Sequence, residues 1–171
     1  LSRFAECLIP LIDENEKKAV EIATKIIKNF EKKYEEKWLN MMRDKLGLFG
    51  MDEKDKFLIL DLLTWMHQKK IDYTNIFCHL MNENIKEDKD YEDEDFKNWK
   101  KRWNERLKTN NNTPEKSLKL MRSANPIVIP RNHKVEEALE AAEKNNFKPI
   151  TRLVEIFKDP YSPQKNILNY Q

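Results

Sequence analysis

The chain has 171 residues, 39% of them hydrophobic and 36% charged, and a formal net charge of +2. Its 32 basic and 30 acidic side chains are interleaved along the sequence rather than segregated. This distribution is typical of solvated helix faces rather than of a nucleic-acid-binding patch. The only glycines are Gly47 and Gly50. Loops that cradle phosphates need several positions without a Cβ, so the standard glycine motifs for nucleotides are excluded within these residues.

The first predicted element is a short helix from Ser2 through Ile9. Pro10 should disturb it, because a proline ring clashes with the preceding helical turn. The chain begins at Leu1, without an initiator Met or a signal-like segment. We therefore expect a piece of a longer protein that starts within a helix.

A long helical pattern follows, opened by a capping box at residues 13–16. Apolar residues recur at helical spacing from Ala19 to Leu46, and Gly47 then stands where helices commonly end. This periodicity fits one helix, or two with a break near Phe30 to Tyr34.

Two capped helices and an aromatic stripe are predicted next. Asp52 is expected to cap a helix from about Glu53 to Gln68, with Ile59, Leu60, Leu63 and Met66 pointing inward. Asp72 should cap a short helix through Met81, and the polar residues 82–90 should form a loop. In residues 92–108, helical spacing predicts that one face packs inward, formed by Phe96, Trp99, Trp103 and Leu107.

The remaining residues predict a linker and further helices. Residues 109–113 are polar and should separate a helical bundle at 1–108 from C-terminal helices at 114–171. Thr113 and Pro114 form a strong helix start, Asn132 should cap a helix from His133 to Lys144, and residues 147–157 should form another. The one β-like run, Ile127 to Ile129, cannot make a sheet by itself. The prediction is an all-α, irregular bundle of about seven to eight helices.

Residues that commonly perform chemistry do not fall into recognisable motifs. The three histidines (His67, His79 and His133) lie far apart, and no His or Cys pair has zinc-site spacing. The acidic run 88–95 lacks the glycine and the final glutamate of a calcium loop, and a helix N-terminus explains it better. No serine or cysteine has a nucleophile context. We therefore assign no catalytic, cofactor-binding or metal-binding residue, and we do not expect this chain alone to be an enzyme.

One segment, residues 125–133, stands out from the background. Two prolines should keep it extended, because each disfavours helical geometry in the residue before it, and three polar residues follow at a helix entry. It has a structural interpretation, with Asn132 as a cap and Arg131 and His133 bonded to nearby carbonyls. It also has a functional one, a docking strip for a partner lobe, with Arg131 pairing to a carboxylate or phosphate. The possible lobe-docking residues are Asn125, Pro126, Arg131, Asn132 and His133.

Cysteine use and hydropathy suggest a compartment only in broad terms. Cys7 and Cys78 lie in apolar helical contexts and are expected to be buried thiols rather than a disulfide. No apolar run approaches the roughly 20 residues that a membrane-spanning helix needs. The expectation is a soluble intracellular protein, in cytoplasm or mitochondrion, without nucleic-acid or membrane partners.

An ordered set of motifs resembles the selenoprotein O family of pseudokinases. The set opens with residues 1–13, and Lys45-Leu46-Gly47-Leu48 matches a family hallmark, as does Asp72-Tyr73-Thr74. The most specific match is Asn125-Pro126 with Arg131-Asn132-His133, followed by residues 135–147 and Pro160-Tyr161. The resemblance covers nearly the whole chain in the right order.

The resemblance implies that the chain is the C-terminal helical part of a protein-kinase-like fold. Full-length family members use ATP and Mg²⁺ to transfer AMP to Ser, Thr or Tyr hydroxyls of other proteins. Their nucleotide, metal and catalytic residues lie in an upstream kinase-like lobe, and no position here matches them. The expected partners are that lobe and the parent's protein substrates, and the chain alone is expected to be inactive. An alternative is an independent helical module that recruits a protein partner.

Two departures from the family pattern concern local contacts. Phe77-Cys78-His79 stands where members often carry Phe-Arg, and the insert around residues 110–112 looks particular to this protein.

Overall fold

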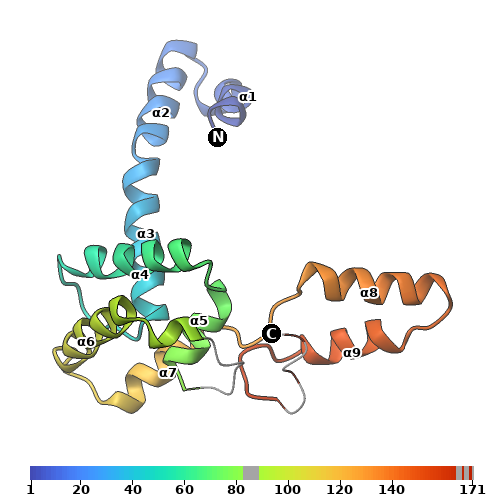
Figure 1. Ribbon diagram of the computed structural model, residues 1–171. Helices are drawn as coiled ribbons and strands as arrows, with labels where there is room; N and C mark the ends of the chain where they lie inside the picture. Colours follow the sequence, from blue (N-terminus) through green and yellow to red (C-terminus); the bar gives the residue numbers. More distant parts are fainter. Residues whose placement is uncertain (83–88, 165–166, 168–169, 171) are drawn as a thin grey trace. The chain divides into compact units, whose positions relative to one another are not determined.

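The computed structural model describes residues 1–82, 89–164, 167 and 170. These residues form helices α1 to α9, a 3-10 helix (η1) and irregular connections, so the all-α prediction is confirmed (Figure 1). By their contacts they divide into two compact units, Leu1–Met41 and Met42–Gln171. The kinase-like fold and the division at residues 109–113 stay predictions. The predicted loop at 82–90 falls largely on residues 83–88, which lie outside the described part.

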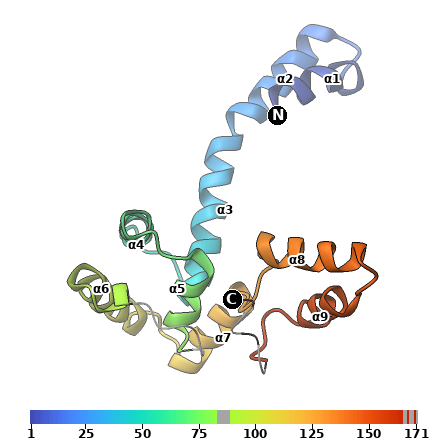
Figure 2. The same ribbon diagram turned by 45° about the vertical axis from the view of Figure 1, so that its right-hand side comes forward.

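The first unit consists of two packed helices and most of a third. α1 (Ser2–Ile12) packs against α2 (Glu16–Lys28), and after Asn29 the chain continues as α3 (Phe30–Lys45) (Figure 2). Of the two possibilities for residues 16–46, the pair of helices is therefore correct.

Two local predictions in this unit are wrong. α1 does not stop before Pro10 but runs on to Ile12. Proline removes a single backbone donor, and only two helical residues follow it, so little is lost there. The N-cap of α2 is Asn15, whose side chain accepts a hydrogen bond from the Lys18 amide at 3.2 Å, rather than a capping box from residue 13.

The second unit contains the end of α3 and all later helices. These are α4 (Asp55–Lys69), α5 (Tyr73–Leu80), η1 (Lys89–Glu92), α6 (Glu94–Lys108), α7 (Pro114–Ala124), α8 (Asn132–Glu143) and α9 (Lys148–Ile156). α4 packs against α6, and α8 and α9 form a helical hairpin (Figure 1).

Aromatic side chains of α4 and α6 build much of this unit's core. Trp65 stacks on Phe96 with ring centroids 4.5 Å apart, and the rings of Phe96, Trp99 and Trp103 follow at 5.8 and 5.9 Å. All four rings are buried, which confirms the predicted packing of Phe96, Trp99 and Trp103, whereas Leu107, predicted on the same face of α6, is only half-buried. The indole N–H of Trp99 donates to the Leu58 carbonyl at 2.8 Å, so its polar edge is satisfied inside the core.

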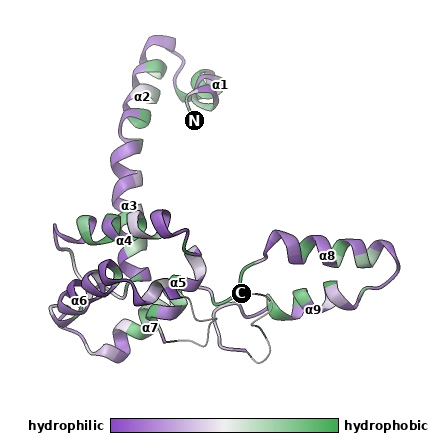
Figure 3. Cartoon of the chain, viewed as in Figure 1, coloured by the Kyte–Doolittle hydropathy of each residue, from purple (hydrophilic) through white to green (hydrophobic). Residues whose placement is uncertain are grey.

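Exposed apolar side chains remain outside this core. Leu60, predicted to point inward, is exposed, because it lies on the side of α4 opposite the buried Leu58 and Leu62. Cys78 is buried as predicted, whereas Cys7 is exposed on α1, where hydrophobic residues recur along the helix (Figure 3).

The helix ends confirm some predicted caps and correct others. Asp72 caps α5, and Thr113 with Pro114 starts α7, both as predicted. Asn132 is not a cap: it is the first residue of α8, behind Arg131 at the N-cap position. Asp52 does not cap α4 either, since that helix begins at Asp55 behind Lys54, although the Asp52 carboxylate accepts a hydrogen bond from the Lys54 amide.

Candidate functional site

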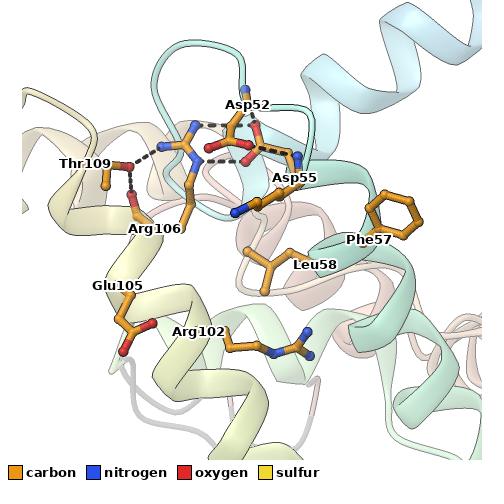
Figure 4. Close-up of a pocket in the computed structure, with 9 residues that line it drawn as sticks. Asp52, Asp55, Phe57, Leu58, Arg102, Glu105, Arg106 and Thr109 are labelled. Carbon is orange, nitrogen blue, oxygen red and sulfur yellow. Dashed lines mark hydrogen bonds and ion pairs between the residues drawn. The ribbon is translucent and has the colours of Figure 1, made fainter.

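A buried carboxylate joins three elements of the second unit. Asp55, at the first turn of α4, accepts hydrogen bonds from the guanidinium Nε of Arg43 on α3 and of Arg106 on α6, each at 2.7 Å. The backbone N–H of Asp52 donates to the same carboxylate at 3.1 Å. Figure 4 shows the Arg106 side chain of α6 directed at the Asp55 carboxylate of α4.

The surroundings of Asp55 keep it ionised. Burial by itself would raise the pKa of this carboxyl, but hydrogen bonds from Arg106 and Arg43 outweigh it, so the pKa lies below its ordinary value. The two guanidiniums are also largely removed from water, with 10% and 11% of their side chains exposed. Each charge in this cluster therefore has a partner inside the protein, as buried ions require.

A groove of about 450 Å³ lies beside this cluster (Figure 4). Its lining comes from the start of α4 and the end of α6, and comprises Asp52, Lys54, Asp55, Phe57, Leu58, Arg102, Glu105, Arg106 and Thr109. Arg102 on its wall pairs with Asp61 at 2.8 Å, and Arg106 also donates to Thr109. The charged groups at this groove hold α4 and α6 together, and their pairing gives no sign of a nucleophile or an acid–base pair.

Asn110 clamps the loop that follows α3. Its amide donates to the Gly47 carbonyl at 2.8 Å and to the Ser117 hydroxyl at 3.1 Å. Its oxygen accepts from the Phe49 amide at 3.0 Å and from Arg106 at 2.8 Å. This asparagine, placed in the predicted linker, is buried and links residues 47–49 to α6 and α7.

Asn125 holds the last residue of α3, just before this loop. Its amide donates to the carbonyls of Lys45 at 2.9 Å and Met121 at 2.8 Å, and its oxygen accepts from the Lys45 ammonium at 3.1 Å. That ammonium also lies 4.9 Å from the Phe77 ring centroid. Removal from water lowers the pKa of Lys45.

The structure separates the five predicted docking residues. Asn125 is fully buried, and Pro126 is half-buried with its carbonyl accepting from the Cys78 thiol at 3.8 Å. Arg131 makes a bidentate pair with Asp72 at 2.6 and 3.0 Å. Asn132 and His133 are exposed. Docking by this strip stays a prediction, and of the five predicted docking residues Asn132 and His133 are the exposed ones.

Sequence reasoning missed the Asp55 cluster and the clamp made by Asn110. A signal for Arg106 existed: it follows Trp103 by three positions and therefore lies on the buried face of α6. An arginine on such a face needs a buried acidic partner. The sequence does not say which acid, because Asp55 is 51 positions away.

The Mg²⁺ that the resemblance implies finds no set of ligands among the residues that the structure describes. Within residues 1–82, 89–164, 167 and 170, no three His, Cys, Asp or Glu side chains are grouped to hold a metal ion. Mg²⁺ is held by carboxylate oxygens and water, whereas the Asp55 oxygens are already occupied by guanidinium and amide donors.

In the part of the chain that the structure describes, no helix is long and apolar enough to cross a bilayer.

Comparison with known proteins assigns the chain to a family. The family model described as protein adenylyltransferase SelO matches residues 1–158. The chain belongs to the SelO family.

Curated relatives in the SelO family match the chain almost end to end. A protein nucleotidyltransferase YdiU of Pelagibacter ubique is 55% identical over 161 residues, which cover 94% of this chain and 33% of the relative. The YdiU protein of Nitrosococcus oceani is 42% identical and covers 100% of this chain and 35% of its own length. The YdiU protein of Clostridium perfringens is 44% identical, and the match covers 99% of this chain and 35% of the relative. The chain thus spans about a third of the length of these relatives.

Proposed function

We propose that this chain is the C-terminal helical scaffold of a SelO-type protein adenylyltransferase. The full-length protein transfers AMP from ATP to Ser, Thr or Tyr hydroxyls of other proteins, and an upstream kinase-like lobe holds the ATP and Mg²⁺. The chain packs against that lobe and supplies no catalytic group. The observation that carries the proposal is that nearly the whole chain matches about a third of the length of proteins named nucleotidyltransferases.

The internal bonding of the second unit supports a structural role. Asp55, Asn110 and Asn125 are the kinds of residue that could hold a ligand, yet each is bonded to groups of the chain itself. These bonds fix the end of α3, the loop after it and the starts of α4 and α7 in one arrangement. A rigid body of this kind suits a support for the active-site loops of a neighbouring lobe.

AMP incorporation tests the catalytic part of the proposal. The 171-residue chain, the separately expressed lobe and the full-length protein are incubated with ATP labelled on its α-phosphate, Mg²⁺ and a protein substrate. We expect label transfer by the full-length protein and none by the chain alone. Robust transfer by the chain alone would refute the scaffold role.

Complex formation separates the proposal from the independent interaction module. Mixing the chain with the separately expressed lobe should give a stable complex on size-exclusion chromatography, which an independent module would not form. Within the strip, Asn132→Ala with His133→Ala should weaken the complex, since both side chains are exposed. His67→Ala, at another exposed histidine, on α4, is the control.

A further inference from the structure

We propose that the outer face of α1, formed by Phe4, Cys7 and Leu11, is a docking surface covered by the kinase-like lobe of the same protein. This inference rests on the proposed function and adds a contact surface outside residues 125–133. It follows from the apolar pattern of α1, from the small core of the first unit and from the length of the relatives.

The apolar side of α1 is wider than α2 can cover. Ala5, Leu8, Ile9 and Ile12 are half-buried, on the helix that packs against α2. Phe4, Cys7 and Leu11 follow at spacings of three and four residues, so they share one side of the helix. Phe4 is 65% exposed and Leu11 82%, and α1 has no buried residue. Ser2, Arg3 and Glu6 form the polar side.

The first unit has a small hydrophobic core, and it exposes more apolar side chains than it buries. In residues 1–41, all of which the structure describes, the buried hydrophobic side chains are Ala19 and Ala23. The same residues expose several large apolar side chains, namely Leu1, Phe4, Leu11, Val20, Ile26, Phe30, Tyr34 and Met41. Exposed apolar surface in excess of the buried core is typical of a segment that packs against a further body.

The size of the face argues for a covalently linked occupant rather than a second copy. A helix of 11 residues is about 16 Å long, and one side of it presents far less than the roughly 800 Å² per partner that a stable dimer buries. A lobe in the same chain docks at high effective concentration and needs less area. The SelO relatives match this helix region and are about three times as long as the chain, which leaves a large body to cover it.

Cys7 is a natural reporter of this contact. Its thiol is exposed on the proposed surface, whereas Cys78 is buried in the second unit and serves as an internal control. Alkylation by N-ethylmaleimide, followed by mass spectrometry of the two cysteine peptides, measures both thiols in one sample. We expect Cys7 to react at least about tenfold more slowly in the full-length protein than in the 171-residue chain, with Cys78 slow in both.

A pair of variants separates docking from unrelated protection. Leu11→Asp in the full-length protein should restore Cys7 alkylation toward the rate in the 171-residue chain carrying the same change. Ser2→Asp adds the same charge on the polar side of α1 and should leave Cys7 protected. Far-ultraviolet circular dichroism checks that both variants keep their helices.

Four results would overturn the proposal. Equal Cys7 rates in the full-length protein and in the 171-residue chain would mean that the lobe does not cover α1. Slow alkylation in the 171-residue chain would mean that the chain covers this face itself, and protection lost on dilution of the full-length protein would indicate a second copy. A chain–lobe complex with reactive Cys7 refutes this surface alone, whereas failure to form any complex refutes the proposed function.

Discussion

Gly47 ends α3 in a backbone conformation that residues with a Cβ rarely adopt. Its φ is +69°, and the Leu48 amide donates to the Arg43 carbonyl at 2.9 Å, which closes the helix in the Schellman manner. A Cβ at this position would lie 2.9 Å from the Ser117 carbonyl oxygen, which belongs to the backbone of α7 and cannot move freely. The glycine is therefore required both by its own backbone and by α7.

Gly47→Ala should lower the free energy of unfolding by about 2 to 3 kcal/mol, because the left-handed strain and the contact with α7 add. Gly50→Ala is the matched control: its φ is +73°, but no atom lies within 4 Å of the added Cβ. It should cost only about 1 kcal/mol. Urea unfolding of both variants measures the difference, and equal losses would contradict a role for α7.

Asp55→Asn should destabilise the chain by about 3 to 5 kcal/mol, because it leaves the buried Arg43 and Arg106 without their shared negative charge. Asp61→Asn removes the acid of an exposed pair with Arg102, whose two side chains are half in water. That control should change stability by less than about 1 kcal/mol. Urea midpoints decide the matter, and a similar small loss at Asp55 would show that the buried cluster contributes little.

Stability should fall in acid with a slope that Asp55 and Asp72 share. At both carboxyls burial acts to raise the pKa, but arginine hydrogen bonds outweigh it, so both folded-state pKa values lie below the ordinary one. The unfolded chain then takes up protons first, at about pH 4, and the stabilisation present above that pH is lost as the pH falls through the folded pKa values. Urea unfolding from pH 7 to pH 3 should show this loss, and it should be smaller for Asp55→Asn than for the original chain.

At the scale of elements, the start of α5 depends on one residue with two roles. Asp72 accepts hydrogen bonds from the Thr74 and Asn75 amides at 2.9 Å each and also holds Arg131, which precedes α8. The cap was evident from sequence, because Asp before a helical run is a common N-cap. The arginine partner was not, since it lies 59 positions away.

A double-mutant cycle with Asp72→Ala and Arg131→Ala should give a coupling energy of about 1 kcal/mol, because the pair is bidentate but partly exposed. Asp72→Ala alone should cost more than Arg131→Ala, since it also removes the cap. The exposed pair of Arg152 and Glu155 is the control and should couple by less than about 0.5 kcal/mol. Urea unfolding measures each corner of the cycle, and additive losses would show that the Asp72 pair adds nothing beyond the cap.

At the scale of the whole molecule, the two units should differ in local stability. The first unit buries Ala19 and Ala23, whereas the second buries the aromatic stack and most of the large apolar side chains. In the 171-residue chain, hydrogen exchange should therefore be fast for the amides of α1 and α2 and slow for those of α4 and α6. Mass spectrometry of exchanged peptides checks this, and equal protection in both units would contradict it.

Local pattern determined the helices, most of their ends and the family. Each of the signals used depends on residues only a few positions apart in the chain. They are helical spacing, the caps at Asp72 and Thr113, the Gly47 stop and the motif at residues 125–133. The sequence did not show that α1 continues through Pro10 to Ile12. It also did not show that Asn132 is the first residue of α8 rather than its cap.

The tertiary structure alone decided which polar residues are internal. Asn110 looked like linker and Asn125 like part of a docking strip. Yet Asn110 holds the loop after α3 and Asn125 holds the last residue of α3, through bonds to residues 61 to 80 positions away. Periodicity reports which side of a helix faces inward but carries no information about which distant groups meet there. That meeting is set by side-chain packing between helices, and it turns these amides and the Asp55 carboxylate into supports for the fold.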